Sequence, residues 1–372
     1  MGYRCPSNGR AHLEGTVQRA GGHVRIGVSL LKADGTLLWT ESFDTQTTDV
    51  FVAQDTMAQQ VASQLQLHLT DDQHTRLSKR STSNPLAYDY YTRAVFSYDQ
   101  RGRGPAAIPQ NERTIELFKR ALAADPNYAM AHAGLAHAYV SDSAGYQAAA
   151  AIREARAAQR LNPNLGQQEL ANFYNHVGLE DLAQREFQRA LEIDPTSTIL
   201  SNDYVSYCLL LHLPDETSAA VRKLFPEEPL PSFYYLMKGD LETAQRRIDE
   251  EAANGVNALT RMMTAYLRAL KGDRKGSEEL LVKLIDEIGD RKRATNYHHL
   301  TCDIASAYAI NGNGPEAIKW LHETSDRGFR SYTLFARDPF LDNIRQLPEF
   351  EQFMSAMKAE YDQLRNEFAA GA

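Results

Sequence analysis

The sequence has few cysteines and no long run of apolar residues. Its three cysteines, Cys5, Cys208 and Cys302, lie far apart with no CxxC spacing, which argues against a disulfide framework or a structural zinc site. The longest apolar stretch, residues 204–214, is shorter than the ~18 residues that a membrane helix needs. The first ten residues hold no apolar signal region. From its sequence alone, the chain is expected in the cytoplasm. If it is a fragment of a membrane-anchored regulator, it is expected in the periplasm.

Positive charge is also scarce. The chain of 372 residues carries 40 Lys and Arg against 48 Asp and Glu, a net charge of −8, whereas a broad nucleic-acid or anionic-membrane surface needs a basic stripe. Residues 1–80 are balanced, so the whole excess of acid lies in 81–372. The apolar share of 43% excludes wholesale disorder. The length suits two units or one extended array.

Residues 1–69 show the alternation of apolar and polar residues that is typical of strands. Three strands are predicted, separated by turns at Gly21-Gly22 and Asp34-Gly35: residues 12–19, 24–30 and 36–43. A helix is expected after Asp49, with an apolar face formed by Val52, Met57, Val61 and Leu65. Because a three-stranded meander buries little, this region is predicted to be an incomplete α+β domain. The polar residues 70–84 are predicted to be a linker.

From Pro85 onward, helical periodicity replaces the strand pattern and the sequence repeats itself. Residues 118–126 (FKRALAADP) return as residues 187–195 (FQRALEIDP), and the ending recurs at residues 161–163 (LNP). Each copy ends in proline, which terminates a helix because it lacks a backbone donor. The spacing between these prolines brackets a period of about 34 residues, which indicates helix hairpins stacked in an array.

Residues 164–197 carry the repeat most completely. Small residues at Ala171 and Ala183 allow two antiparallel helices to approach closely, and Tyr174 and Phe187 are expected to fill the gaps between successive hairpins. With Gly178 at the turn, this pattern resembles the tetratricopeptide family. The predicted fold is mainly α: a tetratricopeptide α-solenoid of about six to seven helix pairs over residues 85–337, followed by capping helices over 338–372.

A second resemblance concerns the first region. Residues 13–20 (LEGTVQRA), 38–44 (LWTESFD) and 49–55 (DVFVAQD) are similar to the later half of a TolB-amino-terminal-like domain, whose first strand and helices have no counterpart here. In bacterial signalling proteins that domain precedes such arrays, downstream of winged-helix, serine/threonine kinase or class III cyclase domains. The resemblance implies that the chain is the sensor or assembly region of a signalling or transcription regulator.

The sequence lacks the motifs of the common classes of enzyme. A kinase requires a glycine-rich loop with HRD and DFG motifs, and neither these nor a Walker or GxSxG motif occurs. His298 and His299 are adjacent, so their rings are expected to point to different sides of a helix and not to chelate one metal ion. The sequence therefore predicts no catalytic residue, no cofactor and no metal site.

Stacked hairpins bind through the concave face of their superhelix, which the first helix of each pair lines. The predicted partner is a protein or peptide, because the residues expected there are polar or small and mostly uncharged. Nine residues are predicted to line this groove: Ala133, His137, Val140, Gln168, Asn172, Asn175, Cys302, Ser306 and Ala309.

Two other readings remain open. In the first, the chain is the carboxy-terminal regulatory half of an enzyme, such as a serine/threonine kinase or class III adenylate cyclase. This reading requires that such a domain is encoded upstream in frame. The chain could also self-associate through the exposed edge of the incomplete sheet, because an unpaired strand edge is a template for pairing.

Overall fold

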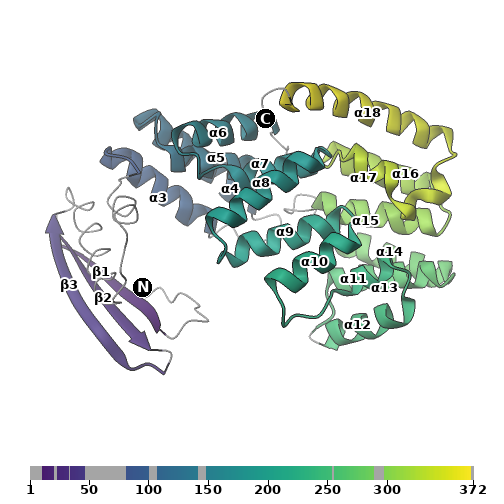
Figure 1. Cartoon of the computed structure of the whole chain (residues 1–372), viewed down its shortest axis with the longest axis horizontal. Coiled ribbons are helices and arrows are strands. Elements are labelled where there is room, and N and C mark those ends of the chain that lie inside the picture. The colour runs from purple at the N-terminus through teal and green to yellow at the C-terminus, as the bar shows by residue number, and fades with distance from the viewer. Residues whose placement is uncertain are drawn as a thin grey trace. The chain divides into compact units, whose positions relative to one another are not determined.

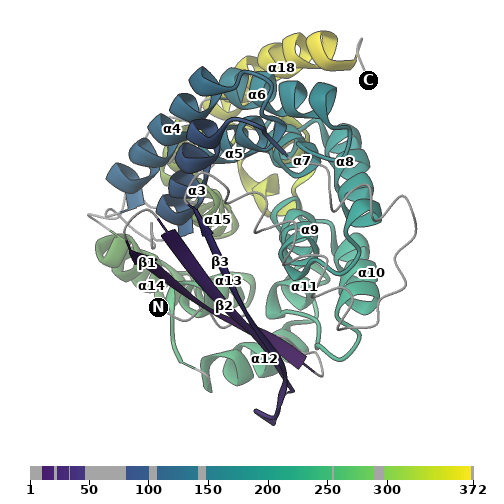
Figure 2. The ribbon, with the colours of Figure 1, turned by 90° about the vertical axis from the view of Figure 1, so that its left-hand side faces the viewer.

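The computed structural model describes residues 11–20, 23–32, 34–46, 81–99, 107–140, 148–253, 255–288 and 297–369. The chain divides into two compact units, residues 1–85 and 86–372. Figures 1 and 2 show both units.

The first unit contains the predicted meander. Strands β1 (Ala11–Ala20), β2 (His23–Lys32) and β3 (Leu37–Gln46) form an antiparallel sheet in the order β1-β2-β3. The register places Ile26 opposite Phe43 and Leu30 opposite Trp39, so apolar side chains face one another across β2 and β3. The Gly21-Gly22 turn and the helix expected after Asp49 lie outside the described residues.

The second unit is an array of helix hairpins, in which each odd-numbered helix of Figure 1 packs against the even-numbered helix that follows it along most of the array. The helices are α3 (Pro85–Asp99), α4 (Ala107–Ala124), α5 (Ala129–Val140), α6 (Ala148–Leu161), α7 (Gln167–His176), α8 (Glu180–Ile193), α9 (Thr198–Leu210), α10 (Pro214–Leu224), α11 (Ser232–Met237), α12 (Leu241–Ala253), α13 (Ala258–Leu270), α14 (Arg274–Ile288), α15 (Tyr297–Ile310) and α16 (Gly314–Asp326).

The packing of α7, α8 and α9 follows the repeat pattern. Ala171 and Ala183 are fully buried where α7 meets α8, because only a small side chain fits between closely packed helices. The ring of Phe187 lies against those of Tyr204 and Tyr207 on α9, with centroids 5.7 and 5.1 Å apart. Phe187 thus fills the gap between successive hairpins, as the sequence predicts.

The turns inside the hairpins reuse one backbone conformation. Gly178, Gly239, Gly272 and Gly312 have φ angles of 79°, 73°, 83° and 76°, the left-handed region that glycine adopts without a steric penalty. At the equivalent turn between α9 and α10 the residue is His212, with φ of 50°. Its N–H donates to Leu209 O at 3.0 Å, matching the bond from Gly239 to Leu236 O.

The carboxy-terminal elements turn the array back on itself. They are α17 (Tyr332–Arg337), the 3₁₀ helix η3 (Pro339–Ile344) and α18 (Pro348–Ala369), of which α18 lies over α16 and α17 in Figure 1. The predicted capping helix over 348–368 is α18, but its contacts extend beyond the last hairpin. Phe368 packs edge-on against Phe173 of α7 at 5.7 Å, and Arg365 pairs with Asp181 of α8.

Two apolar clusters form the interior of the array. The smaller one joins α3 to α6, and the larger one runs from α5 to α18. Among the residues that the structure describes, no helix is both long and apolar enough to cross a membrane.

Candidate functional site

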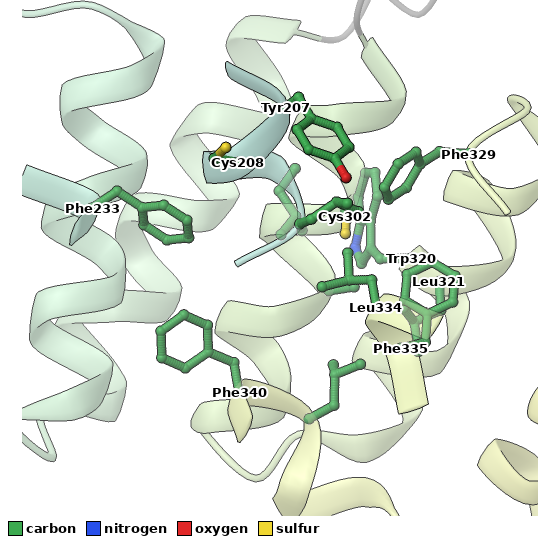
Figure 3. Packing of buried hydrophobic residues seen from close by; sticks show 14 of the residues in the cluster. Tyr207, Cys208, Phe233, Cys302, Trp320, Leu321, Phe329, Leu334, Phe335 and Phe340 are labelled. Carbon is green, nitrogen blue, oxygen red and sulfur yellow. The ribbon is translucent and has the colours of Figure 1, made fainter. Parts of the chain in front are cut away.

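Residues 329–345, which we call the C-terminal plug, run through the interior of the superhelix and contact hairpins from much earlier in the chain. The N–H of Arg330 donates to His176 O at 2.7 Å, and the Arg337 guanidinium donates to Leu211 O at 2.6 Å. The Phe340 ring lies 6.2 Å from that of Phe233 on α11 and 5.3 Å from that of Tyr266 on α13. Figure 3 shows Phe340 and Phe233 in this buried cluster.

A buried histidine and a buried aspartate join the C-terminal plug to the turn between α9 and α10. Nδ1 of His212 lies 3.0 Å from Oδ1 of Asp338, and the two side chains are only 4% and 1% exposed. The other carboxylate oxygen of Asp338 accepts a hydrogen bond from Ser306 at 3.3 Å. This pair keeps a non-glycine residue in the left-handed conformation, since leaving the turn would strand a buried charge.

The charges around this pair shift its proton equilibria. Burial lowers the pKa of His212, but the neighbouring carboxylates of Asp338 and Asp303 raise it by more, so the net pKa is above its usual value. Burial raises the pKa of Asp303 to about 6, against the opposing effects of His212 and of the Tyr266 hydroxyl. Asp303 therefore takes up a proton nearer to neutral pH than an ordinary aspartate does.

Four of the nine predicted groove residues are buried in this half of the array. Asn175, Cys302, Ser306 and Ala309 are at most 3% exposed. Ser306 donates to Asp338, and the carbonyl oxygen of Ala309 accepts from Asn343 at 3.1 Å. The chain's own plug covers Ser306 and Ala309, so a partner could reach these two residues only if the plug moved.

The concave side of the first hairpins is open and holds a pocket of about 240 Å³. Two predicted groove residues, Ala133 and His137, lie on its wall, and Gln168 and Asn172 are half-buried on the adjoining helix α7. Val140 is the last residue of α5, and its side chain lies outside what the structure describes. The pocket is lined by Tyr91, Val95, Tyr98, Phe118, Met130, Ala133, Gly134, His137, Leu165 and Glu169.

The polar rim of this open pocket is acidic. Nδ1 of His137 lies 3.3 Å from Oε1 of Glu169, and its Nε2 contacts the Tyr98 hydroxyl. Gln168 donates to Asp203 of α9 at 2.6 Å. Burial raises the pKa of Asp203, which the bond from Gln168 partly opposes. No lysine or arginine is among the residues that line the pocket, so one ionisable imidazole faces two carboxyl groups.

Sequence reasoning missed Tyr98, Phe118, Glu169 and Asp203 as parts of the site. Glu169 and Asp203 look like ordinary charges on helix surfaces, and only the stacking of α5, α7 and α9 brings them to one place. The tyrosines of α3 could have indicated the pocket, because aromatic residues on several turns of one short helix need an apolar neighbour.

The expectation that the rings of His298 and His299 point apart is wrong. Nε2 of His298 lies 2.9 Å and Nε2 of His299 lies 3.3 Å from Nε2 of His176. The two residues sit in the first turn of α15, and the end of α7 supplies a third imidazole between them. Adjacent side chains on a helix point in different directions, but the imidazoles of His298 and His299 are long enough for both to contact His176 between them.

Neither described cysteine is chemically activated. Cys208 and Cys302 are buried, and burial raises the pKa of the Cys208 thiol to about 12. A thiol with a raised pKa stays protonated and is a weak nucleophile. These two thiols are therefore poor candidates for a nucleophile.

Tetratricopeptide repeat proteins are among the solved structures that are similar to this chain. No protein-family model matches the sequence, and no curated protein matches it. A tetratricopeptide repeat protein from Parabacteroides merdae is similar in structure, with 10% identity and a TM-score of 0.45 over 70% of this chain and 99% of that one. Yeast Tom70 is similar with 15% identity and a TM-score of 0.36, over 86% of this chain and 60% of that one. The array itself, with its stacked antiparallel helix pairs and glycine turns, has the fold of a tetratricopeptide-type α-solenoid.

Proposed function

We propose that this chain is a non-catalytic interaction module that binds a peptide segment in the open pocket between α3, α5 and α7. The segment would carry an apolar side chain for the pocket and a lysine or arginine beside it. One observation carries the proposal: the apolar pocket at the concave face is lined by Glu169 and by no lysine or arginine, and Asp203 lies close enough to Glu169 for their charges to interact.

The size of the pocket supports a side chain as its occupant. Pockets for whole small-molecule ligands usually measure about 300–1,000 Å³, and this one measures about 240 Å³. The ring of Tyr91 packs against Phe118 at 5.9 Å and Tyr128 at 5.0 Å, which gives the pocket an apolar wall held in place by the smaller cluster. An apolar anchor in such a wall is the usual centre of a peptide interface.

The rim supports a basic residue next to that anchor. Glu169 is only 9% exposed, and the pKa of Asp203 is raised chiefly by burial. A cation placed between them would offset the cost of keeping these carboxylates away from water. An acidic peptide would instead add like charge to the same rim.

The experiment selects binders from random peptides displayed on phage, using the full chain as bait. We expect the enriched sequences to pair an aromatic or aliphatic residue with a neighbouring lysine or arginine. A labelled consensus peptide then reports affinity by fluorescence anisotropy. Enrichment of acidic sequences, or of no sequence, would overturn the proposal.

Two pairs of variants locate the site. Ala133→Tyr fills the pocket, and its control Ala123→Tyr places the same ring at an exposed position of α4. Glu169→Gln removes a rim charge, and its control Glu192→Gln removes a charge from the exposed side of α8. We expect a loss of at least about tenfold in affinity for each pocket variant and little change for its control. Equal effects in variant and control would mean that the peptide binds elsewhere.

The biological setting that we propose is the sensor or assembly region of a bacterial signalling or transcription regulator. It rests on the resemblance of residues 13–20 and 38–44 to a TolB-amino-terminal-like domain, and the alternative is the regulatory half of a kinase or cyclase. Sequencing the gene upstream tests both: an in-frame kinase or cyclase domain would favour the alternative, and a winged-helix domain would favour the regulator.

A further inference from the structure

Three imidazoles meet where the end of α7 touches the start of α15. The residues are His176, His298 and His299, which we call the histidine cluster. Each offers one ring nitrogen, and the three nitrogens lie within 4.8 Å of one another. Two of the separations, from Nε2 of His176 to Nε2 of His298 and of His299, are 2.9 and 3.3 Å. The residues come from parts of the chain more than one hundred positions apart.

The hydrogen bonding of His176 determines which of its nitrogens faces the other two rings. Its Nδ1 lies 2.6 Å from the carbonyl oxygen of Asn172, which can only accept, so Nδ1 carries the proton. Nε2 then has its lone pair directed at both other imidazoles. A lone pair accepts one hydrogen bond well, whereas a cation can be shared by all three nitrogens. Anchoring Nδ1–H on a backbone carbonyl is also how metal-ligating histidines are commonly oriented.

The surroundings keep these rings neutral. Burial lowers the pKa of His176 to about 4, with some opposition from the Asn172 carbonyl, and lowers that of His299 to about 3. Phe329 packs on the cluster, its ring nearly parallel to that of His298 at an angle of 19°. Arg327, whose charge also lowers the pKa of His298, pairs with Glu323 at 3.0 Å. Neutral imidazole is the form that binds metals.

We propose that the histidine cluster binds a divalent transition-metal ion of zinc type, with a water molecule in the fourth position. Tetrahedral zinc bonds to histidine nitrogen at about 2.0–2.1 Å, which places the ligand nitrogens about 3.4 Å apart. The separations of 2.9 and 3.3 Å from Nε2 of His176 lie within about 0.5 Å of this value, and the third separation is at most 4.8 Å. Among the described residues the cluster offers three nitrogens and no carboxylate, which favours zinc over calcium or magnesium, because those two ions prefer oxygen ligands.

Such an ion would cross-link the array at a specific place. It would join α7 to α15, and the carbonyl of His176 already accepts the N–H of Arg330 at the start of the C-terminal plug. Metal binding would therefore favour the arrangement in which the plug is held inside the superhelix, because the ion binds only when both helices are in place.

The test uses the full chain without a polyhistidine tag. Isothermal titration with Zn²⁺ alone should show one ion per chain, and Co²⁺ should give the visible absorption of a tetrahedral site. Each of His176→Gln, His298→Gln and His299→Gln should weaken Zn²⁺ binding by about 100-fold. The matched control is His23→Gln, which changes an exposed histidine on β2 and should leave the affinity unchanged.

Folding and binding are separated in two ways. Circular dichroism of each variant without metal checks that the helices form, and the thermal midpoint of the unmodified chain should rise with Zn²⁺ concentration. If the unmodified chain binds no Zn²⁺, or if a folded variant that lacks all three imidazoles binds it equally well, the proposal is wrong. Octahedral Co²⁺ spectra would also overturn it, since they indicate binding to surface oxygens.

Discussion

The first hairpins of the array and the later ones are built from the same repeat but differ in what occupies their concave face. Over α3, α5 and the start of α7 the face carries an open pocket with an acidic rim. From the α7–α8 turn to α15 the C-terminal plug lies against it. A repeat pattern therefore specifies the hairpin and its stacking, and tertiary contacts decide whether its concave face is available to a partner.

The difference can be traced to single positions. In the hairpins from α7 to α16, which the C-terminal plug contacts, His212 occupies the turn position that is glycine in the other four hairpins. Its imidazole contacts Asp338. In the open half, the concave wall carries Glu169 and His137. Both places bring one imidazole near two carboxyl groups, but the first set is buried under the plug and the second lies at an open pocket.

The largest expected effect comes from removing an aromatic side chain of the plug. Phe340→Ala deletes a ring that is 7% exposed and packed against Phe233 and Tyr266. It should lower the free energy of unfolding by about 3–5 kcal/mol. The matched variant Phe96→Ala removes a ring that is 53% exposed on α3 and should cost under about 1 kcal/mol. Urea denaturation measures both; equal losses would mean that the plug is not part of the core.

Acid should destabilise the plugged half through the histidine cluster. The folded pKa values of His176 and His299, about 4 and about 3, lie below the unfolded value of about 6.5. A depressed pKa contributes stability that is present above pH 6.5 and is lost as the pH falls through the folded pKa. His176 alone should account for about 3 kcal/mol between pH 7 and 4. Urea titrations at each pH, without metal, measure the free energy of unfolding. Its dependence on pH should be flatter when all three histidines are replaced by glutamine, and an unchanged slope would contradict the assignment.

Neutralising Asp338 tests the contact between the plug and the α9–α10 turn. Asp338→Asn keeps the cap on η3, where the side chain accepts from the Phe340 N–H at 3.0 Å, but removes the charge beside His212. The expected cost is about 2 kcal/mol. The pKa of His212 is higher in the folded than in the unfolded state. Its contribution to the free energy of unfolding is therefore fully present below the unfolded-state pKa and is lost as the pH rises through the folded-state pKa.

The difference between the variant and the parent chain should therefore shrink toward alkaline pH. Asp303 and Arg337 also act on His212, and both are present in the two proteins compared, so their direct contributions largely cancel. A cost that grows with pH would show that the Asp338 charge is not stabilised by His212.

The smallest expected difference is between two glycine turns. Gly239 and Gly178 share a left-handed backbone, but an added Cβ at Gly239 meets no atom within 4 Å, whereas at Gly178 it lies 2.9 Å from the Thr333 hydroxyl of the plug. Gly239→Ala should cost about 1 kcal/mol from backbone strain alone. Gly178→Ala should lower the free energy of unfolding by about 1 kcal/mol more than Gly239→Ala does, because the Thr333 side chain must shift. Thermal and urea unfolding of the two variants compares them; equal costs would show that the plug yields freely.

Features that depend on neighbours in the chain could be predicted from the sequence. The strands of the meander, the hairpins ended by Pro126, Pro163 and Pro195, and the helix over 348–368 follow from periodicity and from turn residues that act locally. The packing of Phe187 between hairpins was predictable for the same reason, since successive repeats are neighbours in space.

The plug and the histidine cluster could not be predicted in this way. His176 and His298 are 122 positions apart, and Arg337 and Leu211 are 126 positions apart. No pattern within one repeat encodes a contact of that range, because it depends on the curvature accumulated over several hairpins. For the same reason Cys302, Ser306 and Ala309 had the positions of groove residues in their own repeat, yet they are buried.

The return of α18 and the plug to α7 and α8 has a consequence for how the chain folds. In an open array each repeat contacts only its neighbours, so unfolding can proceed piecewise from either end. Here Arg365 pairs with Asp181 and Phe368 packs on Phe173, which couples the last helix to the middle of the chain. Closing so long a loop is entropically costly and slows folding. Helices α5 to α18, which share the larger apolar cluster, should therefore unfold as a single cooperative block, whereas α3 and α4 can fray separately.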